Sequence, residues 1–502
     1  MSALAPYNHP STPMQRYQRF LALSNISFKQ HQLDGVLWCV DKETCLQPVV
    51  DGVRGGFIAD EMGLGKTIMS IGICVANLLP RTLIVLPCVL ISQWCTEILR
   101  TTGHTPLVYY GSDKKNITTA QLEAAHIVIT SYHSIIVSKK NIVSPMHTIF
   151  WNRVIFDEAH HLRNKNNLFL GARSIKTEIR WLITGTPIQN KHSDFKNLCS
   201  VIGIPASLLS DSDLLHNHFI LRRTKVSANI VLPELFVDKE SVPWKSESER
   251  SLSQDIHTSL AYAERSEKLK LFIRARQICI LPIMFRNNIE QMADDHIIRD
   301  NHRETVTHCS SKMDVVVDSI LARKGNGNGK LVFCHFREEI DTIIQRLSLR
   351  GLTNVSSFDG RTRQSSRIFK LKQKFEVLVL QIQTGCEGLN LQNDFNEVYF
   401  VSPHWNPSIE DQAVARCHRI GQTKPVHVFK YEMDTFRSDP VSQEIAESPL
   451  PHLTLDQYVA IKQASKRDIS HSILERSEAL SVAKGDGERG NSEGGSRRSL
   501  HS

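Results

Sequence analysis

Short runs of aliphatic residues alternate with segments whose apolar residues recur at helical spacing, and this alternation occurs twice along the chain. The first stretch has such runs at 56–59, 82–87, 125–131, 153–158 and 180–185. The second has them at 331–335, 355–358, 377–382, 398–401 and 426–431. Continuous aliphatic strands separated by helices are typical of parallel sheets covered on both faces. The pattern therefore predicts an α/β fold with two parallel-sheet lobes in tandem.

The pattern changes between and outside the two lobes. Residues 239–295 are charged and have apolar residues at helical spacing, which predicts helices between the lobes. The C-terminal stretch is rich in Gly, Ser and Arg and is expected to be disordered. The predicted segments are a flexible N-terminus (1–23), lobe 1 (24–227), a helical connector (228–311), lobe 2 (312–437), a C-terminal helical segment (438–475) and a disordered tail (476–502).

Composition narrows the class of protein. Hydrophobic residues at 41% and charged residues at 22% of 502 are ordinary for a folded globular chain. No apolar run approaches the roughly 20 residues that cross a bilayer, and the polar start of the chain lacks a secretory signal. The eleven cysteines form no C-x-x-C pair, which favours free thiols in a reducing compartment. The net charge of +8 is compatible with a polyanionic partner but does not demonstrate one.

Only one group of residues is reminiscent of a metal cluster. His296, His302, His308 and Cys309 lie close together in the sequence, but their spacing matches no common metal site. Solvated histidines are the favoured interpretation.

A turn between a predicted strand and a predicted helix ends in Gly-Lys-Thr, which is the layout of a phosphate-binding loop. Backbone N–H groups at the start of the helix face an anion, the lysine supplies positive charge, and the threonine hydroxyl can hold Mg²⁺. The general pattern has glycine where this chain has an acid, so an ordinary glycine-containing turn stays open on this stretch alone. The candidate cofactor-binding residues of the loop are Asp60, Glu61, Met62, Gly63, Leu64, Gly65, Lys66 and Thr67.

A pair of acids follows the aliphatic run at 153–156. Ligands bind at the carboxyl ends of the strands of such sheets, where Asp157 and Glu158 are expected to lie beside the loop. Asp157 can hold Mg²⁺, and Glu158 can orient and deprotonate a water. Two acids that merely cap a strand are the alternative, which the presence of the loop in the same lobe disfavours.

Three further features carry candidate chemistry. Gln32, on a predicted helix, can donate and accept as the edge of adenine requires, although an exposed helical glutamine is the alternative. Arg416 and Arg419 are three apart, so on a helix they share one face. They could stabilise charge on a transferred phosphoryl group, or form surface ion pairs. The basic cluster at 222–225 is either a solvated face or touches phosphate.

Four motifs occur in order: 60–67, Asp157-Glu-Ala-His160, Leu182-Ile-Thr-Gly-Thr-Pro-Ile-Gln-Asn190 and Arg416-Cys-His-Arg-Ile-Gly-Gln422. Through them the chain resembles the Swi/Snf-type (Snf-two) helicase-like ATPases of helicase superfamily two, over roughly residues 24–470. This family's loop begins with acid, as here. The resemblance implies two RecA-like lobes with ATP between them, a C-terminal bracing helix, and tracking along double-stranded DNA.

The resemblance also implies roles for single residues. Gln32 matches the adenine-reading glutamine, Lys66 and Thr67 the phosphate and magnesium residues, and Asp157 the magnesium carboxylate. Glu158 matches the catalytic base, and Arg416 and Arg419 the arginines of the last motif, with Arg419 favoured as the finger. The stretches that match the lining of the DNA path are Leu86–Trp94, Thr130–Tyr132, Cys334–Phe336 and Gly385–Gln392.

Departures from the family limit the biological assignment. Trp405-Asn-Pro407 is similar to the lesion-tolerance branch, but no Cys/His pattern of a RING insert is present, and no histone-reading extension is found. The expected function is a nuclear, ATP- and Mg²⁺-dependent translocase on double-stranded DNA, acting alone or within a larger complex. Its cargo, a nucleosome, a stalled fork or another DNA-bound protein, stays open. A strand-separating DNA or RNA helicase and a non-hydrolysing DNA-binding scaffold are the alternatives.

Overall fold

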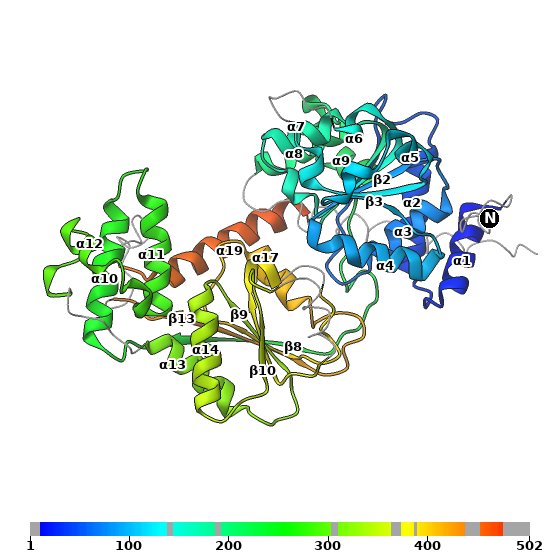
Figure 1. Ribbon diagram of the computed structural model, residues 1–502. Helices are drawn as coiled ribbons and strands as arrows, with labels where there is room; N and C mark the ends of the chain where they lie inside the picture. Colours follow the sequence, from blue (N-terminus) through cyan, green and yellow to red (C-terminus); the bar gives the residue numbers. More distant parts are fainter. Residues whose placement is uncertain are drawn as a thin grey trace, which may run out of the picture. The chain divides into compact units, whose positions relative to one another are not determined.

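The computed structural model describes residues 11–137, 144–185, 192–302, 310–362, 373–385, 389–436 and 452–474. The chain divides into two compact units. The first comprises the chain up to Asn229 together with the part from Lys466 onward, and the second comprises Ile230–Ser465. Each unit is built on its own sheet (Figure 1).

The first sheet is parallel at every described pairing, and its strand order is β3-β4-β2-β5-β6-β1-β7. Its five longer strands match the predicted aliphatic runs. The short strands β3 and β7 were not predicted, because three and two residues are too few to make a pattern. The strands are β1 Arg54–Ile58, β2 Thr82–Leu86, β3 Leu107–Tyr109, β4 Ile127–Ser131, β5 Phe150–Asp157, β6 Lys176–Ile183 and β7 Ile220–Leu221.

Helices cover both faces of this sheet. Consecutive strand residues enter different cores, since their side chains point to opposite faces: Phe57 packs in one hydrophobic cluster and Ile58 in the other. The cluster that contains Ile58 also takes residues of α1 Pro13–Ser24, α2 Gln30–Thr44, α3 Lys66–Ala76 and α4 Ile91–Thr102. The opposite cluster takes residues of α5 Thr119–Ala124, α6 Pro145–Thr148, α7 Asn167–Ser174, α8 His192–Ile202 and α9 Ser212–Phe219.

Helix α1 corrects the expectation of a flexible N-terminus for residues 13–23. Thr12 and Gln15 form a reciprocal capping box at its start. Tyr17 and Phe20 are fully buried in the first unit's core, and Arg16 Nε donates to the Ala76 carbonyl at 2.7 Å. The narrow apolar face of α1 lies among polar residues, so the segment looks solvent-exposed in sequence.

A buried ion pair fixes the position of α2. Arg153 is fully buried and binds both carboxylate oxygens of Glu43, at 2.6 and 2.5 Å. Trp181 Nε1 donates to the same carboxylate at 2.8 Å, and Asn77 Nδ2 donates at 2.7 Å. Since these partners come from β5, β6 and the end of α3, the network ties α2 to the sheet and to α3.

The second sheet is also parallel at every described pairing, in the order β10-β11-β9-β12-β13-β8. Its edge strand β8 comes from the range expected to be a helical connector. Seven of its eight residues are exposed and three of its central residues are charged, so no aliphatic run marks it. The strands are β8 Leu235–Val242, β9 Lys330–Cys334, β10 Val355–Phe358, β11 Val377–Gln381, β12 Glu397–Phe400 and β13 Val426–Met433.

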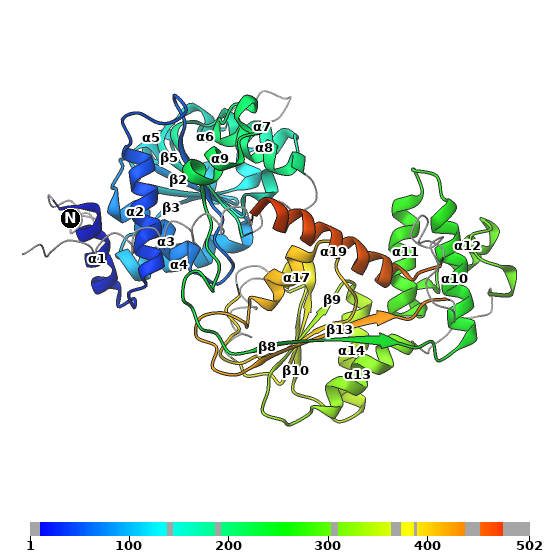
Figure 2. The same cartoon turned by 180° about the vertical axis from the view of Figure 1, so that it is seen from behind.

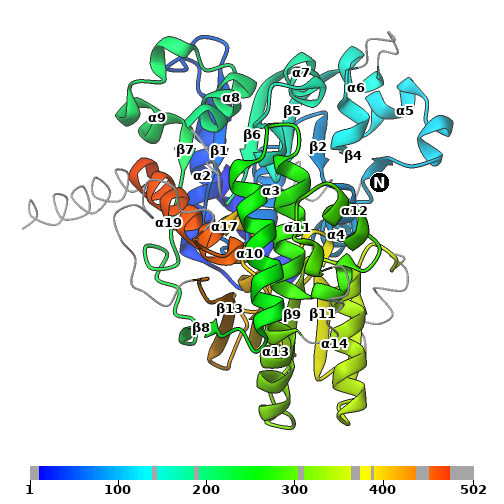
Figure 3. The same cartoon turned by 90° about the vertical axis from the view of Figure 1, so that its left-hand side faces the viewer.

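The helices of the expected connector belong to the second unit. Helices α10 Glu247–Tyr262 and α11 Lys268–Ile280 lie side by side (Figures 2 and 3). Their apolar residues share one core with β9, β11, β12 and β13. The sequence also predicts a helix at 364–375, between the aliphatic runs of β10 and β11, but this range falls mostly outside the described residues. The other helices are α12 Ile289–Asp294, α13 Ser311–Ala322, α14 Arg337–Leu349, α16 Ile382–Gly385, α17 Pro407–Val414 and α19 Leu455–Leu474.

The start of α19 is anchored in this core by polar contacts. Asp456, 2% exposed, pairs with the buried ammonium of Lys312 and accepts from Ser402 Oγ at 2.6 Å. The Leu455 N–H donates to His257 Nε2 at 2.8 Å. The C-terminal helix that the sequence predicts is therefore present, and its first turn is fixed. In the described part of the chain, no helix has the length and apolarity that a membrane span needs.

Candidate active site

The predicted phosphate loop lies between β1 and α3. Gly63 and Gly65 have φ angles of 92° and 84°, a region that side chains strongly disfavour, so glycine is required at both turns. Helix α3 begins at Lys66 and receives no side-chain cap. The N–H groups of its first turn are therefore available to an anion, as the sequence predicts.

Lys66 lies over the loop's own backbone. Its Nζ donates to the carbonyl oxygens of Asp60 at 2.8 Å and Glu61 at 3.3 Å. Burial lowers the pKa of Lys66, whereas the charges of Glu158, Asp60 and Asp157 act to raise it. The loop lysine and the two acids at the end of β5, Asp157 and Glu158, are thus electrostatic neighbours.

Asp157 is held by two hydrogen bonds. Trp94 Nε1 donates to its Oδ2 at 2.9 Å, and the Glu158 N–H donates to its Oδ1 at 3.0 Å. Burial, with a contribution from the Glu158 charge, raises the pKa of Asp157 to about 7, although both hydrogen bonds and Lys66 oppose the shift. Trp94 was not predicted to contact an acid, because nothing local distinguishes it from a core tryptophan.

Glu158 has a strained backbone, with φ 50° and ψ 49° in the left-handed region. Such a conformation in a residue other than glycine persists only when its surroundings enforce it, and it is common at functional sites. The carboxylate lies 3.3 Å from His160 Nδ1. The Tyr132 hydroxyl donates to the Asp157 carbonyl at 2.6 Å, which fixes the turn on its other side.

Gln32 is 3% exposed, so the alternative of an exposed helical glutamine is wrong. Its Nε2 donates to the Leu64 carbonyl at 3.0 Å. Its Oε1 is buried and has no hydrogen-bond partner among the described residues. A Cβ at Gly65 would lie 2.3 Å from Gln32 Nε2, so the amide packs directly on the glycine. A buried acceptor with no partner, beside an anion-binding loop, fits a nucleobase.

The basic cluster at 222–225 is half-buried, and two of its basic side chains are paired with acids of the loop. Arg223 binds both carboxylate oxygens of Asp60, which is 1% exposed. Lys225 binds the carboxylate of Glu61, with Nζ 3.1 Å from Oε1. The carboxylates of Asp60 and Glu61, two residues expected to bind the cofactor, are thus occupied by basic side chains, while their carbonyls accept hydrogen bonds from Lys66.

The arginines of the last motif lie in the second unit, and their geometry differs from the expectation. Helix α17 ends at Val414, so Arg416 and Arg419 follow it in turns and do not share a helix face. Arg419 Nη1 donates to Asn390 Oδ1 at 2.5 Å. Burial, followed by the charge of Arg416, lowers the pKa of Arg419. The Nε atoms of both arginines are buried and have no partner among the described residues.

The described residues contain no group of three or more His, Cys, Asp or Glu that could hold a metal ion. His308 and Cys309, half of the weak cluster in the sequence, lie outside that part of the chain. The oxygen donors of Thr67 and Asp157 are nevertheless the type that Mg²⁺ accepts when phosphate oxygens and waters complete its shell. The motif at 182–190 is described only as far as Gly185, where a Cβ would lie 3.4 Å from Lys66 Nζ.

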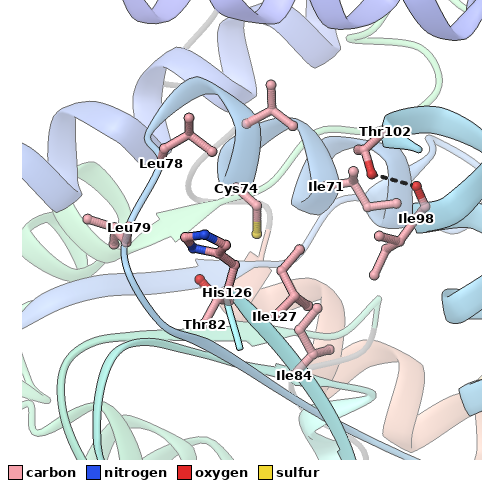
Figure 4. Close-up of a pocket in the computed structure, with 11 residues that line it drawn as sticks. Ile71, Cys74, Leu78, Leu79, Thr82, Ile84, Ile98, Thr102, His126 and Ile127 are labelled. Atoms are coloured by element: carbon pink, nitrogen blue, oxygen red, sulfur yellow. Dashed lines mark hydrogen bonds between the residues drawn. The ribbon is translucent and has the colours of Figure 1, made fainter. Parts of the chain in front are cut away.

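A second cavity in the first unit does not compete with this site. It is lined by apolar side chains of α3, α4 and the start of β4, with Cys74 and His126 facing each other (Figure 4). The space open to a water-sized sphere is about 10 Å³. This is the lower limit for a single water, so the cavity is too small for a ligand.

Comparisons with known proteins agree with the motifs. The SNF2-related domain matches residues 31–219, and the helicase conserved C-terminal domain matches residues 311–421. A probable global transactivator of Orgyia pseudotsugata multicapsid polyhedrosis virus is 26% identical over 447 residues, which cover 81% of this chain and 86% of the viral protein.

Two longer relatives are similar over most of this chain. The ISWI chromatin-remodeling complex ATPase ISW2 of Saccharomyces cerevisiae is 25% identical over 495 residues, or 88% of this chain. The ATP-dependent DNA helicase DDM1 of Arabidopsis thaliana is 26% identical over 532 residues, or 92% of this chain. The alignments span only 42% of ISW2 and 66% of DDM1, so both relatives contain regions beyond those matched here.

Proposed function

Because the chain belongs to the Swi/Snf-type family of helicase-like ATPases, we propose that it hydrolyses ATP to move along double-stranded DNA and remodel DNA–protein complexes. One observation carries the proposal: Lys66, Asp157 and Glu158 lie together at the carboxyl end of the sheet, beside the free helix N-terminus of α3. These are the parts that phosphoryl transfer to water requires.

In this proposal, different residues of the first unit bind the phosphates, the base and the magnesium ion of Mg–ATP. The N–H groups at the start of α3 and the Lys66 ammonium bind the phosphates, and Gln32 reads the base. Asp157 and Thr67 are the residues that would hold Mg²⁺, which neutralises charge on the phosphates when bound. Because protonation of Asp157 would weaken that contact, its hydrogen bonds from Trp94 and from the Glu158 N–H assist binding by favouring the charged carboxylate.

Glu158 is placed for the chemical step. Its carboxylate orients a water and accepts a proton as the water oxygen bonds to the terminal phosphorus and ADP leaves. At Glu158 the backbone leaves the extended conformation of β5, and the Glu158 carboxylate lies 3.3 Å from His160 Nδ1. Arg416 and Arg419 are proposed to stabilise charge on the transferred group, with Arg419 as the finger, so that hydrolysis depends on both units.

Double-stranded DNA is the proposed track. The relatives are named for chromatin remodelling and DNA helicase activity, and the net charge of +8 suits a polyanion. Contacts mostly to phosphate would make binding largely independent of sequence and sensitive to salt. A nuclear location, action as a monomer or within a complex, and a nucleosome or another DNA-bound protein as cargo follow as parts of the same proposal.

ATP turnover tests this function. Turnover of wild type and Glu158→Gln would be measured with no nucleic acid, duplex DNA, single-stranded DNA and RNA. Duplex DNA is expected to stimulate the wild type most, and the variant is expected to lose at least 100-fold in kcat while still binding nucleotide. If ATP turnover were the same with and without duplex DNA, the proposed function as a DNA-dependent motor would be refuted.

The same measurement separates the alternatives. Preference for RNA or for single strands would favour a strand-separating helicase. Binding of duplex DNA without turnover would favour a scaffold. Lys66→Ala serves as the matched control, since it removes nucleotide binding and leaves the Glu158 carboxylate in place.

A further inference from the structure

Residues 221–225, here called the exit segment, run alongside the nucleotide loop. Strand β7 pairs with β1 in parallel, and the pairing continues beyond both strands. The Ala59 N–H donates to the Leu221 carbonyl and the Glu61 N–H to the Arg223 carbonyl, both at 2.8 Å. The exit segment leads directly into the chain of the second unit, which begins at Ile230. The loop and the exit segment thus share backbone hydrogen bonds within the first unit.

Side chains reinforce this backbone pairing. Arg222 Nη1 donates to the Ala59 carbonyl at 2.9 Å. The Lys225 N–H donates to Glu61 Oε2 at 2.7 Å, and its ammonium lies 3.1 Å from the other oxygen. Every basic residue of the exit segment therefore binds a loop residue between 59 and 61.

Arg223 makes the most contacts. Its Nε and Nη2 bind the two oxygens of Asp60 at 3.0 and 2.5 Å, a bidentate geometry that lysine cannot reproduce. Its Nη1 donates to the His31 carbonyl on α2, and Nη2 lies 3.3 Å from Met69 Sδ on α3. One guanidinium thus joins the loop, the helix that carries Gln32, and the helix whose N-terminus faces the anion.

Two sequence features that the fold alone does not require are explained by this guanidinium. A Cβ at Gly35 would lie 2.6 Å from Arg223 Nη2 and 2.5 Å from Met69 Sδ, so glycine within α2 makes room for the arginine. Asp60 stands where the general loop pattern has glycine, and its buried carboxylate would be left without a charge partner if Arg223 were removed.

We propose that Arg223 is a positioning residue for the nucleotide loop, through which the exit segment senses whether nucleotide is bound. The inference rests on the proposed function. Lys66 Nζ bonds the carbonyls of residues 60 and 61, the same residues that Arg223 holds through the Asp60 carboxylate and the Glu61 N–H. When Lys66 binds phosphate, these peptide units change partners, and the exit segment bonded to them changes with them.

Nucleotide affinity is the first test, on the full chain. Kd for a fluorescent ADP without DNA, and kcat and KM for ATP with duplex DNA, would be measured for Arg223→Lys, Arg223→Gln, Asp60→Asn and the double variant Arg223→Gln/Asp60→Asn. Arg223→Gln is expected to weaken ADP binding about tenfold, and Arg223→Lys about threefold, because lysine keeps the charge but not the fork. The double variant is expected to lose far less than the sum of the single losses, because the partners are coupled.

Arg54→Gln is the matched control, since Arg54 also lies near an acid of this sheet, Glu178, but this acid is exposed and the two groups are 4.0 Å apart. It is expected to bind ADP like the wild type. A loss of ADP affinity in this control equal to that in Arg223→Gln would overturn the assignment to Arg223.

Hydrogen exchange distinguishes positioning from simple structural support. In the wild type, ADP is expected to slow amide exchange both in the loop and in the exit segment, including at Lys225. In Arg223→Gln, the loop is expected to respond as in the wild type while the response of the exit segment becomes clearly smaller, because only the backbone bonds and the Arg222 and Lys225 contacts to residues 59–61 remain. Unchanged ADP affinity and an unchanged response of the exit segment, with only a lower Tm, would show that Arg223 merely supports the fold and would overturn the proposal. If Arg223→Gln does not fold, Arg223→Lys answers the same question.

The outcomes also separate this inference from the proposed function. Wild-type protein that fails to bind ADP would defeat the proposed function. Wild-type protein that binds ADP, with an exit segment that responds to it in Arg223→Gln as in the wild type, would defeat the role of Arg223 alone.

Discussion

Trp94 contacts the carboxylate on which magnesium binding is proposed to depend. The indole is 2% exposed on α4, and its N–H donates to Asp157 at 2.9 Å. A hydrogen bond to a charged group in a buried site contributes roughly 1.5–3 kcal/mol. Since the resemblance implies that Leu86–Trp94 lines the DNA path, this contact also connects that stretch with Asp157.

We predict that Trp94→Phe lowers kcat for ATP by roughly tenfold and moves the acid side of the pH profile to higher pH. The indole N–H favours the charged Asp157, so its loss raises the pKa of that carboxyl above the present value of about 7. The measurement is kcat against pH at saturating Mg²⁺. Trp38→Phe, which removes an indole of α2 without touching Asp157, is expected to leave the profile unchanged. An unshifted profile in Trp94→Phe would show that the contact is only packing.

At the residue scale, sequence reasoning singled out the paired acids and the loop lysine because each follows a local pattern of strand, turn and helix, whereas Gln32, within a helix, was given a role only by the resemblance. It missed what Asp60 binds. The partner, Arg223, is 163 residues away, and no local pattern connects a loop acid with a basic cluster at the end of the lobe.

At the scale of elements, the first turn of α19 is hydrogen-bonded to His257 on α10, and this histidine must stay neutral for the bond to form. His257 is buried, and its Nε2 accepts from the Leu455 N–H while Nδ1 donates to the Ser253 carbonyl at 2.7 Å. A protonated ring could not accept this bond. Burial lowers the pKa of His257 to about 4, although the bond to Ser253 and the Asp456 charge oppose the shift.

The second unit is therefore expected to lose stability as pH falls. Between about pH 6.5 and 4, His257 binds a proton in the unfolded chain but not in the folded unit. The free energy of unfolding therefore decreases with decreasing pH. From pH 7 to 5 this residue contributes a loss of roughly 2 kcal/mol. Urea unfolding of His257→Asn at both pH values is expected to show a smaller loss than wild type. His427→Asn, on β13, is the control, and equal pH dependence in all three proteins would contradict the assignment.

Helices and strands were predicted well where a continuous aliphatic run marked them, and poorly where only one face of the element is buried. The continuous runs of β2 and β4 are buried on both faces and were recognised. Helix α1 hides a narrow apolar face among polar residues, and β8 is an exposed edge with one neighbouring strand. A strand of this type is defined by its partner β13 and not by its own side chains.

The whole molecule has separate cores. Two hydrophobic clusters lie entirely within the first unit and two entirely within the second. The nucleotide loop belongs to the first unit alone. Cooperative unfolding follows the core, so each unit is expected to unfold as its own transition.

Calorimetry of the full chain is expected to show two unfolding transitions. ADP is expected to raise the Tm of only one of them, that of the first unit. A ligand at 100 times its Kd adds about 2.7 kcal/mol to the state it binds, or roughly 5–10 °C for a unit of this size. Hydrogen exchange at intermediate temperature identifies the unit that responds. Lys66→Ala is expected to abolish the shift. A single transition, or a shift confined to the second unit, would contradict this expectation.

The sequence by itself determined the two parallel-sheet lobes, the loop, the paired acids and the family, because strand burial and turn chemistry are written in neighbouring residues. Tertiary structure alone decided which polar groups meet: Glu43 with Arg153, Trp94 with Asp157, and Asp60 with Arg223, at separations of 110, 63 and 163 residues. Such pairs depend on which elements pack side by side. A local pattern fixes the conformation of an element, but only the packed fold selects its neighbours.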